Sequence, residues 1–325
     1  MKICVVGAGA IGGYMGVELS LAGEDVTLIA RGEHLDAIVR NGLRLELADG
    51  TSRTATDLTA YDAMSDAGTH DVVILALKAQ QIETVAAQLG HLYHDDTVVV
   101  TVQNGIPWWY FHKHGGPYDG HRLKALDPHG TLDKSIPFER ILGCIAYPAA
   151  EKAAPGVIRH VEGNRFPLGE LDGSKSDRVK QLADVFSTAG FKSRVVADIR
   201  AQIWLKAWGN MTFNPISALT HATLAQICRF PETRGLAESM MTEAQTLAEK
   251  LGVTFRYTIE QRIAGAEAVG EHKTSMLQDL EAGRPLETEA LIGVVAELGR
   301  LTETPTPSID AVYACVKLLG EGQAP

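Results

Sequence analysis

Long apolar segments and clusters of basic residues are both missing from this 325-residue sequence. The apolar runs, of which 71–77 and 97–102 are typical, are far too short to span a bilayer, so we expect no membrane partner. The chain has 40 acidic residues against 30 lysines and arginines, and the resulting net charge of −10 disfavours a nucleic-acid partner.

Cysteine is also scarce. The sequence contains four cysteines, which are Cys4, Cys144, Cys228 and Cys315. They make neither a CxxC pair nor a zinc-type spacing, so we expect buried free thiols in a reducing cytoplasm. Because the first predicted strand begins at Lys2, we expect no signal peptide. Four histidines cluster in an aromatic, glycine-rich segment at 108–137, but no carboxylate or cysteine pattern accompanies them, and we predict no metal site.

Short apolar runs alternate with amphipathic segments in the first part of the chain, which is typical of a doubly wound parallel sheet. We expect strands at 2–6, 25–30, 71–76, 97–102 and 141–147, and helices at 11–22 and 80–89. Helical periodicity then dominates, at 201–214, 233–250, 258–268, 275–282, 287–302 and 308–319. The sequence thus predicts an α/β protein in which a Rossmann-type domain (1–198) precedes an all-helical domain (199–325).

A glycine-rich loop joins the first predicted strand to the first predicted helix. It reads Gly7-Ala8-Gly9-Ala10-Ile11-Gly12. The first glycine permits a tight turn, the second lets a pyrophosphate approach the backbone, and the third allows close helix packing. The helix N-terminus that follows presents N–H groups to phosphates. We predict that these six residues bind a dinucleotide, the alternative being a tight turn without a ligand.

The second predicted strand lacks the acidic residue that NAD sites commonly place at its end. Ala30 and Arg31 stand there instead, and a guanidinium can pair with a 2′-phosphate that a carboxylate would repel. We therefore expect NADP(H) as the cofactor. The alternative is a solvated surface arginine, and the nearby Glu33 counts against the prediction.

Two further polar residues directly follow predicted strands. Lys78 follows the strand at 71–76, and Asn104 follows the strand at 97–102. Ligands bind at the carboxyl ends of strands in open α/β sheets, so both are candidate cofactor residues. A loop lysine and an ordinary Asn-Gly turn are the alternatives.

The predicted helix at 201–214 carries a polar row. Lys206, Asn210 and Asn214 are spaced four apart and share one face, while Trp204 and Trp208 lie on other sides. If those sides are buried, the row lines a cleft, where desolvation lowers the pKa of a lysine and amides orient a substrate. The alternative is a surface stripe on an ordinary amphipathic helix.

A second group of polar residues lies between 272 and 293. Ser275 could cap the next predicted helix, with Asp279 on its following turn, and Glu287 could be a first-turn acid of the helix after it. Alternatively, Ser275 binds a carboxylate, and Glu287 faces the cofactor or Lys206. The spacing leaves both interpretations open.

Five motifs in this order resemble those of the ketopantoate reductase family (2-dehydropantoate 2-reductases). They are KICVVGAGAIGG with Arg31, LALKAQQ, QNG, RAQIWLKAWGNMTFNPISALT and TSMLQDLEAGRPLE, and they cover nearly the whole chain. The resemblance implies a Rossmann domain and a helical domain with the active site in the cleft between them. It also implies reduction of a 2-oxo acid by NADPH, typically of 2-dehydropantoate to pantoate in pantothenate biosynthesis.

The resemblance further assigns roles to single residues. Lys206 would be the catalytic proton donor, with Glu287 near it and the cofactor. The implied substrate-binding residues are Asn104, Lys206, Asn210, Asn214 and Ser275. Lys78, Asn104, Ala149 and Glu287 would join the glycine loop and Arg31 at the cofactor. A homodimer is the family-level expectation.

Two departures from the family pattern concern the substrate. The segment THATLAQ lacks an asparagine that the shorter, biosynthetic members have, and the segment after Asn104 is longer and more aromatic than theirs. The aromatic residues of that segment are Trp108, Trp109, Tyr110 and Phe111. They could shape a pocket for a bulkier 2-oxo acid, or bury a subunit or loop contact. An NADP-sensing protein without turnover is the non-enzyme alternative, which the full polar row opposes.

Overall fold

The computed structural model describes residues 1–322, which fall into two compact units. Unit 1 comprises residues 1–103, 111–121 and 130–199. Of the described residues, unit 2 comprises 104–110, 122–129 and 200–322. Two short pieces of the loop region before residue 130 therefore pack with the C-terminal helices.

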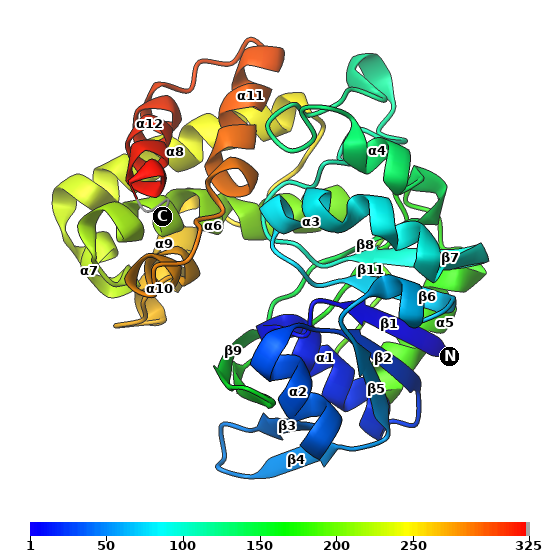
Figure 1. Cartoon of the computed structure of the whole chain (residues 1–325). Helices are drawn as coiled ribbons and strands as arrows, with labels where there is room; N and C mark the ends of the chain where they lie inside the picture. The colour runs from blue at the N-terminus through cyan, green and yellow to red at the C-terminus, as the bar shows by residue number, and fades with distance from the viewer. Residues whose placement is uncertain (323–325) are drawn as a thin grey trace. The chain divides into compact units, whose positions relative to one another are not determined.

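A seven-stranded sheet forms the centre of unit 1 (Figure 1). Its strands are β1 (Lys2–Val6), β2 (Asp25–Ile29), β5 (Leu58–Tyr61), β6 (His70–Leu75), β7 (Tyr93–Thr101), β8 (Ile141–Cys144) and β11 (Leu168–Gly169). They lie in the order β11-β8-β7-β6-β1-β2-β5, and every neighbouring pair is parallel except β11 with β8. The predicted doubly wound sheet is confirmed. Its strand order reverses between β1 and β6, and ligands bind outside the carboxyl ends of strands at such a point.

A second, four-stranded sheet in unit 1 was not predicted from the sequence. It consists of β4 (Ser52–Ala55), β3 (Leu43–Glu46), β10 (Val157–Glu162) and β9 (Ala149–Ala154), in that order. Helix α1 (Ala10–Leu21) contacts strands of both sheets. A Cβ atom at Gly13 would lie 2.6 Å from Ile158 of the small sheet, and one at Gly16 would lie 2.7 Å from Leu28 of the large sheet. The two glycines therefore allow α1 to pack closely between the sheets.

The remaining helices of unit 1 are short, apart from α2 and α5. They are α2 (Gly32–Asn41), α3 (Ala79–Val85), α4 (Thr131–Ser135) and α5 (Asp177–Thr188), with 3₁₀ turns at Met64–Asp66, Ala86–Leu92, Gly116–Tyr118 and Phe138–Arg140. Helix α2 was not predicted, although it follows Arg31 directly. The strand predicted at 141–147 is too long, because β8 ends at Cys144.

Unit 2 is helical, as predicted. Its elements are α6 (Ile199–Thr220), α7 (Leu224–Arg229), α8 (Pro231–Lys250), α9 (Ile259–Ala268), α10 (Ser275–Glu281), a π-helical turn η5 (Glu289–Gly293), α11 (Val294–Leu301) and α12 (Pro307–Glu321). Trp204 and Trp208 of α6 are fully buried, and the indole Nε1 of Trp208 donates a hydrogen bond to the Met241 carbonyl of α8 at 2.9 Å. A buried indole N–H needs such an acceptor, so this bond fixes α6 against α8.

Helix boundaries in unit 2 differ from the prediction at several places, α7 was not predicted, and two of the differences have a structural explanation. Helix α6 continues through Pro215 to Thr220, although proline removes one helical hydrogen bond. Ile216 and Ala218 beyond it are buried, and their packing outweighs that loss. The helix predicted from Glu287 starts later and begins as the π-helical turn.

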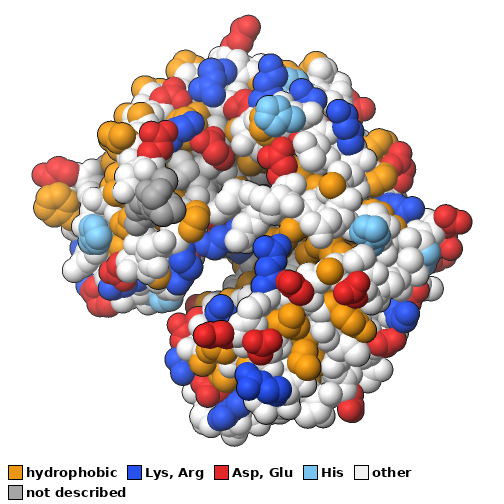
Figure 2. Space-filling view, viewed as in Figure 1, with side chains coloured by type: hydrophobic (Ala, Val, Ile, Leu, Met, Phe, Trp, Pro, Cys, Tyr) orange, Lys and Arg blue, Asp and Glu red, His pale blue; other side chains and the backbone are white. Residues whose placement is uncertain are grey.

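Among residues 1–322, no helix is long and apolar enough to cross a membrane. Within the same range, no three histidine, cysteine or acidic side chains are grouped as a metal site requires. Cys315 is exposed on α12, contrary to the expectation of buried thiols, while the other three cysteines are buried. On the face shown in Figure 2, acidic and basic side chains are interspersed.

Candidate active site

The glycine loop follows β1 and has no room for side chains at two of its glycines. Gly7 has a φ of +100°, and a Cβ atom there would lie 2.7 Å from Leu77. A Cβ atom at Gly12 would lie 2.0 Å from the Gly7 carbonyl oxygen. Gly9 differs, because a Cβ atom there would meet no atom within 4 Å, and no side chain caps helix α1 at this residue. The open space beside Gly9 at a helix N-terminus fits a phosphate group.

A cavity of about 360 Å³ adjoins the loop, and we call it the loop cavity. It lies at the carboxyl ends of β1 and β6, where Val6 and Leu77 line it, as expected for the point at which the strand order reverses. Its charged lining residues are Arg31 and Lys152. No carboxylate is among the described residues that line it, so its charges favour an anionic ligand.

The predicted cofactor residues of unit 1 occupy different places around the loop. Gly7, Ala8, Gly9 and Arg31 line the loop cavity. Ala10, Ile11 and Gly12 form the first turn of α1. Lys78 immediately precedes α3, and its backbone N–H donates a hydrogen bond to the Gln81 side chain. Ala149 is the first residue of β9. Their binding roles remain predictions.

His34 forms a hydrogen bond with the glycine loop, a contact that no sequence pattern predicted. Its Nδ1 accepts a hydrogen bond from the Gly156 N–H at 2.9 Å, so its Nε2 carries the proton and donates to the Ala8 carbonyl at 2.7 Å. The imidazole is 8% exposed, and burial is the main cause that lowers its pKa. A neutral His34 therefore connects the loop to the turn between β9 and β10.

In unit 2, the polar row of α6 has specific partners. The Lys206 Nζ donates a hydrogen bond to the Asn104 Oδ1 at 2.6 Å, and the Asn214 Nδ2 donates to the Ser275 Oγ at 3.4 Å. Lys206 and Asn210 are half-buried, and Asn214 is only 6% exposed. From Lys206 to Asn214 the row rises by about 12 Å along the helix. A surface stripe would be exposed throughout, so the burial favours the alternative of a lined site.

Asn104 reaches Lys206 because the next two residues pack against the π-helical turn. The Ile106 N–H donates to the Ala290 carbonyl of η5 at 3.2 Å. Gly105 has a φ of +83°, and a Cβ atom there would lie 1.9 Å from the same carbonyl oxygen. Only glycine fits this contact, so Gly105 determines where Asn104 lies.

The structure separates the two interpretations of Ser275. Thr274, not Ser275, caps α10, because the Thr274 hydroxyl accepts a hydrogen bond from the Leu277 N–H. The capping alternative for Ser275 is therefore wrong, and its hydroxyl contacts Asn214 instead. Asp279 forms an ion pair with Arg284 at 2.8 Å. Glu287 is 7% exposed and precedes η5, outside any first helical turn.

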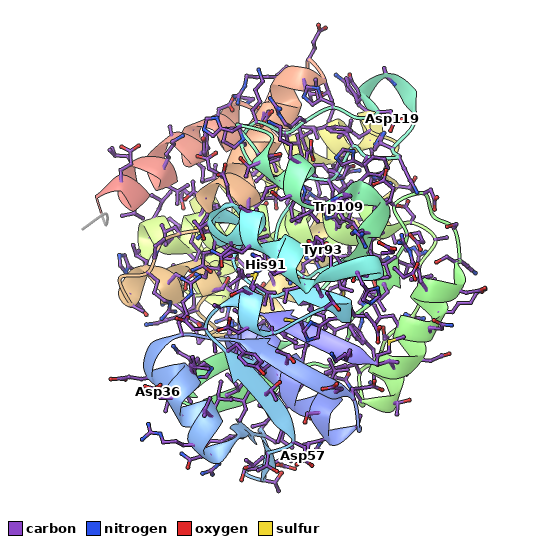
Figure 3. The ribbon with its side chains drawn as sticks, turned by 45° about the vertical axis from the view of Figure 1, so that its right-hand side comes forward. Asp36, Asp57, His91, Tyr93, Trp109 and Asp119 are labelled. Atoms are coloured by element: carbon purple, nitrogen blue, oxygen red, sulfur yellow. The ribbon has the colours of Figure 1, made fainter. Side chains whose placement is uncertain are left out.

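The aromatic segment after Asn104 is packed inside the protein. Trp108, Trp109, Tyr110 and Phe111 are each at most 4% exposed. The Tyr110 hydroxyl accepts a hydrogen bond from the Trp204 indole at 2.8 Å, and the Tyr110 carbonyl accepts one from Arg200 at 2.8 Å. Trp109 lies among interior side chains, whereas Asp119 lies at the edge of the molecule (Figure 3). These contacts favour a buried structural role over a substrate pocket.

Comparisons with known proteins identify the family. One family model, described as ketopantoate reductase PanE/ApbA, matches residues 3–173, and its C-terminal counterpart matches residues 198–320. A 2-dehydropantoate 2-reductase of Mesorhizobium japonicum is 53% identical over 320 residues, which cover 98% of each chain. The chain belongs to the ketopantoate reductase family. The motif resemblance is thereby confirmed, and the protein is an oxidoreductase.

Solved structures of ketopantoate reductases share the fold. A Ralstonia solanacearum protein assigned to these reductases is 40% identical, with a TM-score of 0.94 over 99% of this chain and 98% of the other. A D-mandelate dehydrogenase solved with NADH and anilino(oxo)acetate is 24% identical, with a TM-score of 0.84 over 99% of each chain. The second likeness establishes a common fold only.

The contact of Gly105 with η5 predicts the effect of Gly105→Ala. The added Cβ atom displaces Asn104 from Lys206, and we expect kcat/KM of the reductase reaction to fall by about 100-fold. Gly50→Ala is the matched control, because Gly50 has a φ of +84° but no atom within 4 Å of an added Cβ atom. Equal activities of the two variants would show that Gly105 has no positioning role.

The buried His34 predicts a loss of stability in acid. The unfolded chain binds a proton at His34 near pH 6.5, whereas the folded protein binds it only at lower pH because its pKa is lowered. The stabilisation is therefore complete above about pH 6.5 and is lost as the pH falls through the folded pKa.

We expect the melting temperature of His34→Gln to fall less between pH 7 and pH 5 than that of the unchanged protein. Calorimetry at the two pH values measures the difference. His70, whose pKa burial also lowers, titrates in both proteins and accounts for a residual fall. Identical falls would mean that His34 is not kept neutral by the fold.

Proposed function

We propose that this protein reduces a 2-oxo acid to a 2-hydroxy acid with NADPH, and that the substrate is 2-dehydropantoate, giving pantoate for pantothenate biosynthesis. The observation that carries this proposal is the 2.6 Å hydrogen bond between the Lys206 ammonium and the Asn104 amide. Lys206 lies on helix α6, which also carries Asn210. A relative that is 53% identical over 98% of both chains, and is named 2-dehydropantoate 2-reductase, supports the choice of substrate.

The residues of unit 1 fit an NADP(H) molecule. Gly9 leaves room for the pyrophosphate at the N-terminus of α1, and Arg31 lines the loop cavity where NAD sites have an acidic residue. Arg31 would pair with the 2′-phosphate of the adenosine ribose. When bound, the reduced nicotinamide supplies a hydride to the ketone carbon.

Lys206 would act as the general acid. An ammonium has three N–H donors, and Asn104 accepts one of them, which orients the others. A second donor would hydrogen-bond the ketone oxygen of the substrate and transfer its proton as negative charge develops there. Glu287, which the family resemblance places near Lys206, would keep that lysine protonated between turnovers.

The other polar residues of unit 2 would orient the substrate. Asn210 and Asn214 would hydrogen-bond its hydroxyl and carbonyl groups, and Ser275, whose hydroxyl contacts Asn214, would hold its carboxylate. Asn104 would serve the substrate and the cofactor as well as Lys206. The homodimer and the cytoplasmic location remain predictions.

A bulkier 2-oxo acid is less well supported as the substrate. The aromatic residues that could have shaped a larger pocket are buried in packing contacts. In THATLAQ, the segment without the expected asparagine, Thr223 and Gln226 form a capping box at the start of α7. This segment therefore has a structural reason for its composition.

Steady-state assays with two cofactors and several 2-oxo acids test the proposed function. We expect kcat/KM to be highest for NADPH with 2-dehydropantoate, and lower with NADH because Arg31 has no phosphate to pair with. A higher value for an aryl or branched 2-oxo acid would move the substrate assignment to the bulkier class. Cofactor binding without turnover on any substrate would favour an NADP-sensing protein.

A further inference from the structure

The loop cavity contains a second cation that the sequence did not single out. Lys152 lies on β9 of the small sheet, far along the chain from Arg31, yet both line the same cavity. A 2′-phosphate carries nearly two negative charges near neutral pH, so one arginine leaves part of its charge uncompensated. A second positively charged side chain at this place would neutralise the remaining negative charge of the phosphate.

Two contacts fix β9 and β10 beside the glycine loop. The first is the close approach of α1 to β10, where a Cβ atom added at Gly13 would lie 2.6 Å from the Ile158 side chain. The second is the hydrogen bond from the Gly156 N–H to His34, whose other nitrogen donates to Ala8. The hairpin that carries Lys152 is therefore anchored to the loop itself.

The pairing register of β9 and β10 places Lys152 on the face of the hairpin that is turned toward α1 and the glycine loop. Lys152 is paired with Ile158 across the two antiparallel strands, and directly opposite residues project from the same face. Because Ile158 packs on Gly13 of α1, that face is the one turned toward α1. The pKa of His34 is lowered mainly by burial, and the positive charge of Lys152 lowers it further, which agrees with this placement.

Acidic residues near this site are directed elsewhere. Glu151, the neighbour of Lys152, forms an ion pair with Arg159 at 2.7 Å. Glu33 and Asp36 of α2 are exposed and do not line the loop cavity, and Asp36 projects away from the ribbon (Figure 3). Among residues 1–322, no carboxylate that lines the cavity competes with an anion for its two cations.

We propose that Lys152 is a specificity-determining residue that joins Arg31 in binding the 2′-phosphate of NADP(H). This inference rests on the proposed function. Arg31 would pair with two phosphate oxygens through its planar guanidinium, and Lys152 would add a point charge. NADH offers the two residues only an uncharged ribose hydroxyl, so neither can form an ion pair with it there.

Binding measurements on Lys152→Gln test the proposal without relying on turnover. Fluorescence titration gives Kd for NADPH and NADH, and calorimetry gives Kd for 2′,5′-ADP and 5′-AMP. We expect Lys152→Gln to raise Kd for NADPH and 2′,5′-ADP by about three- to tenfold, the scale of one exposed charged contact. Kd for NADH and 5′-AMP should change by less than about twofold. Lys152→Glu should weaken NADPH binding further by repulsion.

Lys175→Gln is the matched control, because Lys175 is an exposed lysine of unit 1 that does not line the loop cavity. It should leave all four Kd values unchanged. Equal weakening of NADPH and NADH by Lys152→Gln would place Lys152 at the pyrophosphate and overturn the proposal, as would no change in either. Tighter binding of NADH than of NADPH by the unchanged protein would contradict the proposed cofactor itself, and is a separate outcome.

Discussion

The hydrogen bond between the Lys206 ammonium and the Asn104 amide is the contact on which the catalytic account depends. Asn104 follows the β7 strand of unit 1 but packs with the helices of unit 2, where it meets Lys206 at 2.6 Å. An amide oxygen orients an ammonium without removing its charge, so Lys206 can remain a proton donor. The buried tryptophans of α6 hold the lysine side of this contact, and the π-helical turn holds the asparagine side.

Close approaches at glycine position the proposed cofactor residues of unit 1 and the proposed catalytic residues of unit 2. In unit 1, Gly12 allows α1 to begin directly after the loop, and Gly13 brings the small sheet against the same helix. In unit 2, Gly105 lies against the Ala290 carbonyl and thereby places Asn104. At Gly12 and Gly105 a single Cβ atom would force two backbone segments apart, and a catalytic group misplaced by about 1 Å loses much of its effect.

The sequence predicts those parts that local pattern determines. The glycine loop, the parallel strands and the amphipathic helices have short periodicities, and the sheet and the helical unit appear as expected. What it misses depends on tertiary packing. His34 and Lys152 reach the loop through contacts with distant segments, Pro215 is tolerated because its neighbours are buried, and Thr274 rather than Ser275 caps α10. No spacing rule contains that information.

A double-mutant cycle on Lys206 and Asn104 tests whether their contact supports catalysis. We expect Lys206→Ala to lower kcat/KM by about two to four decades, the usual scale of acid–base catalysis, with NADPH binding retained. We expect Asn104→Ala to lower kcat/KM much less in the Lys206→Ala background than in the unchanged protein, because its main partner is already absent. Near-normal turnover of Lys206→Ala, or strictly additive losses, would show that this contact does not support proton transfer.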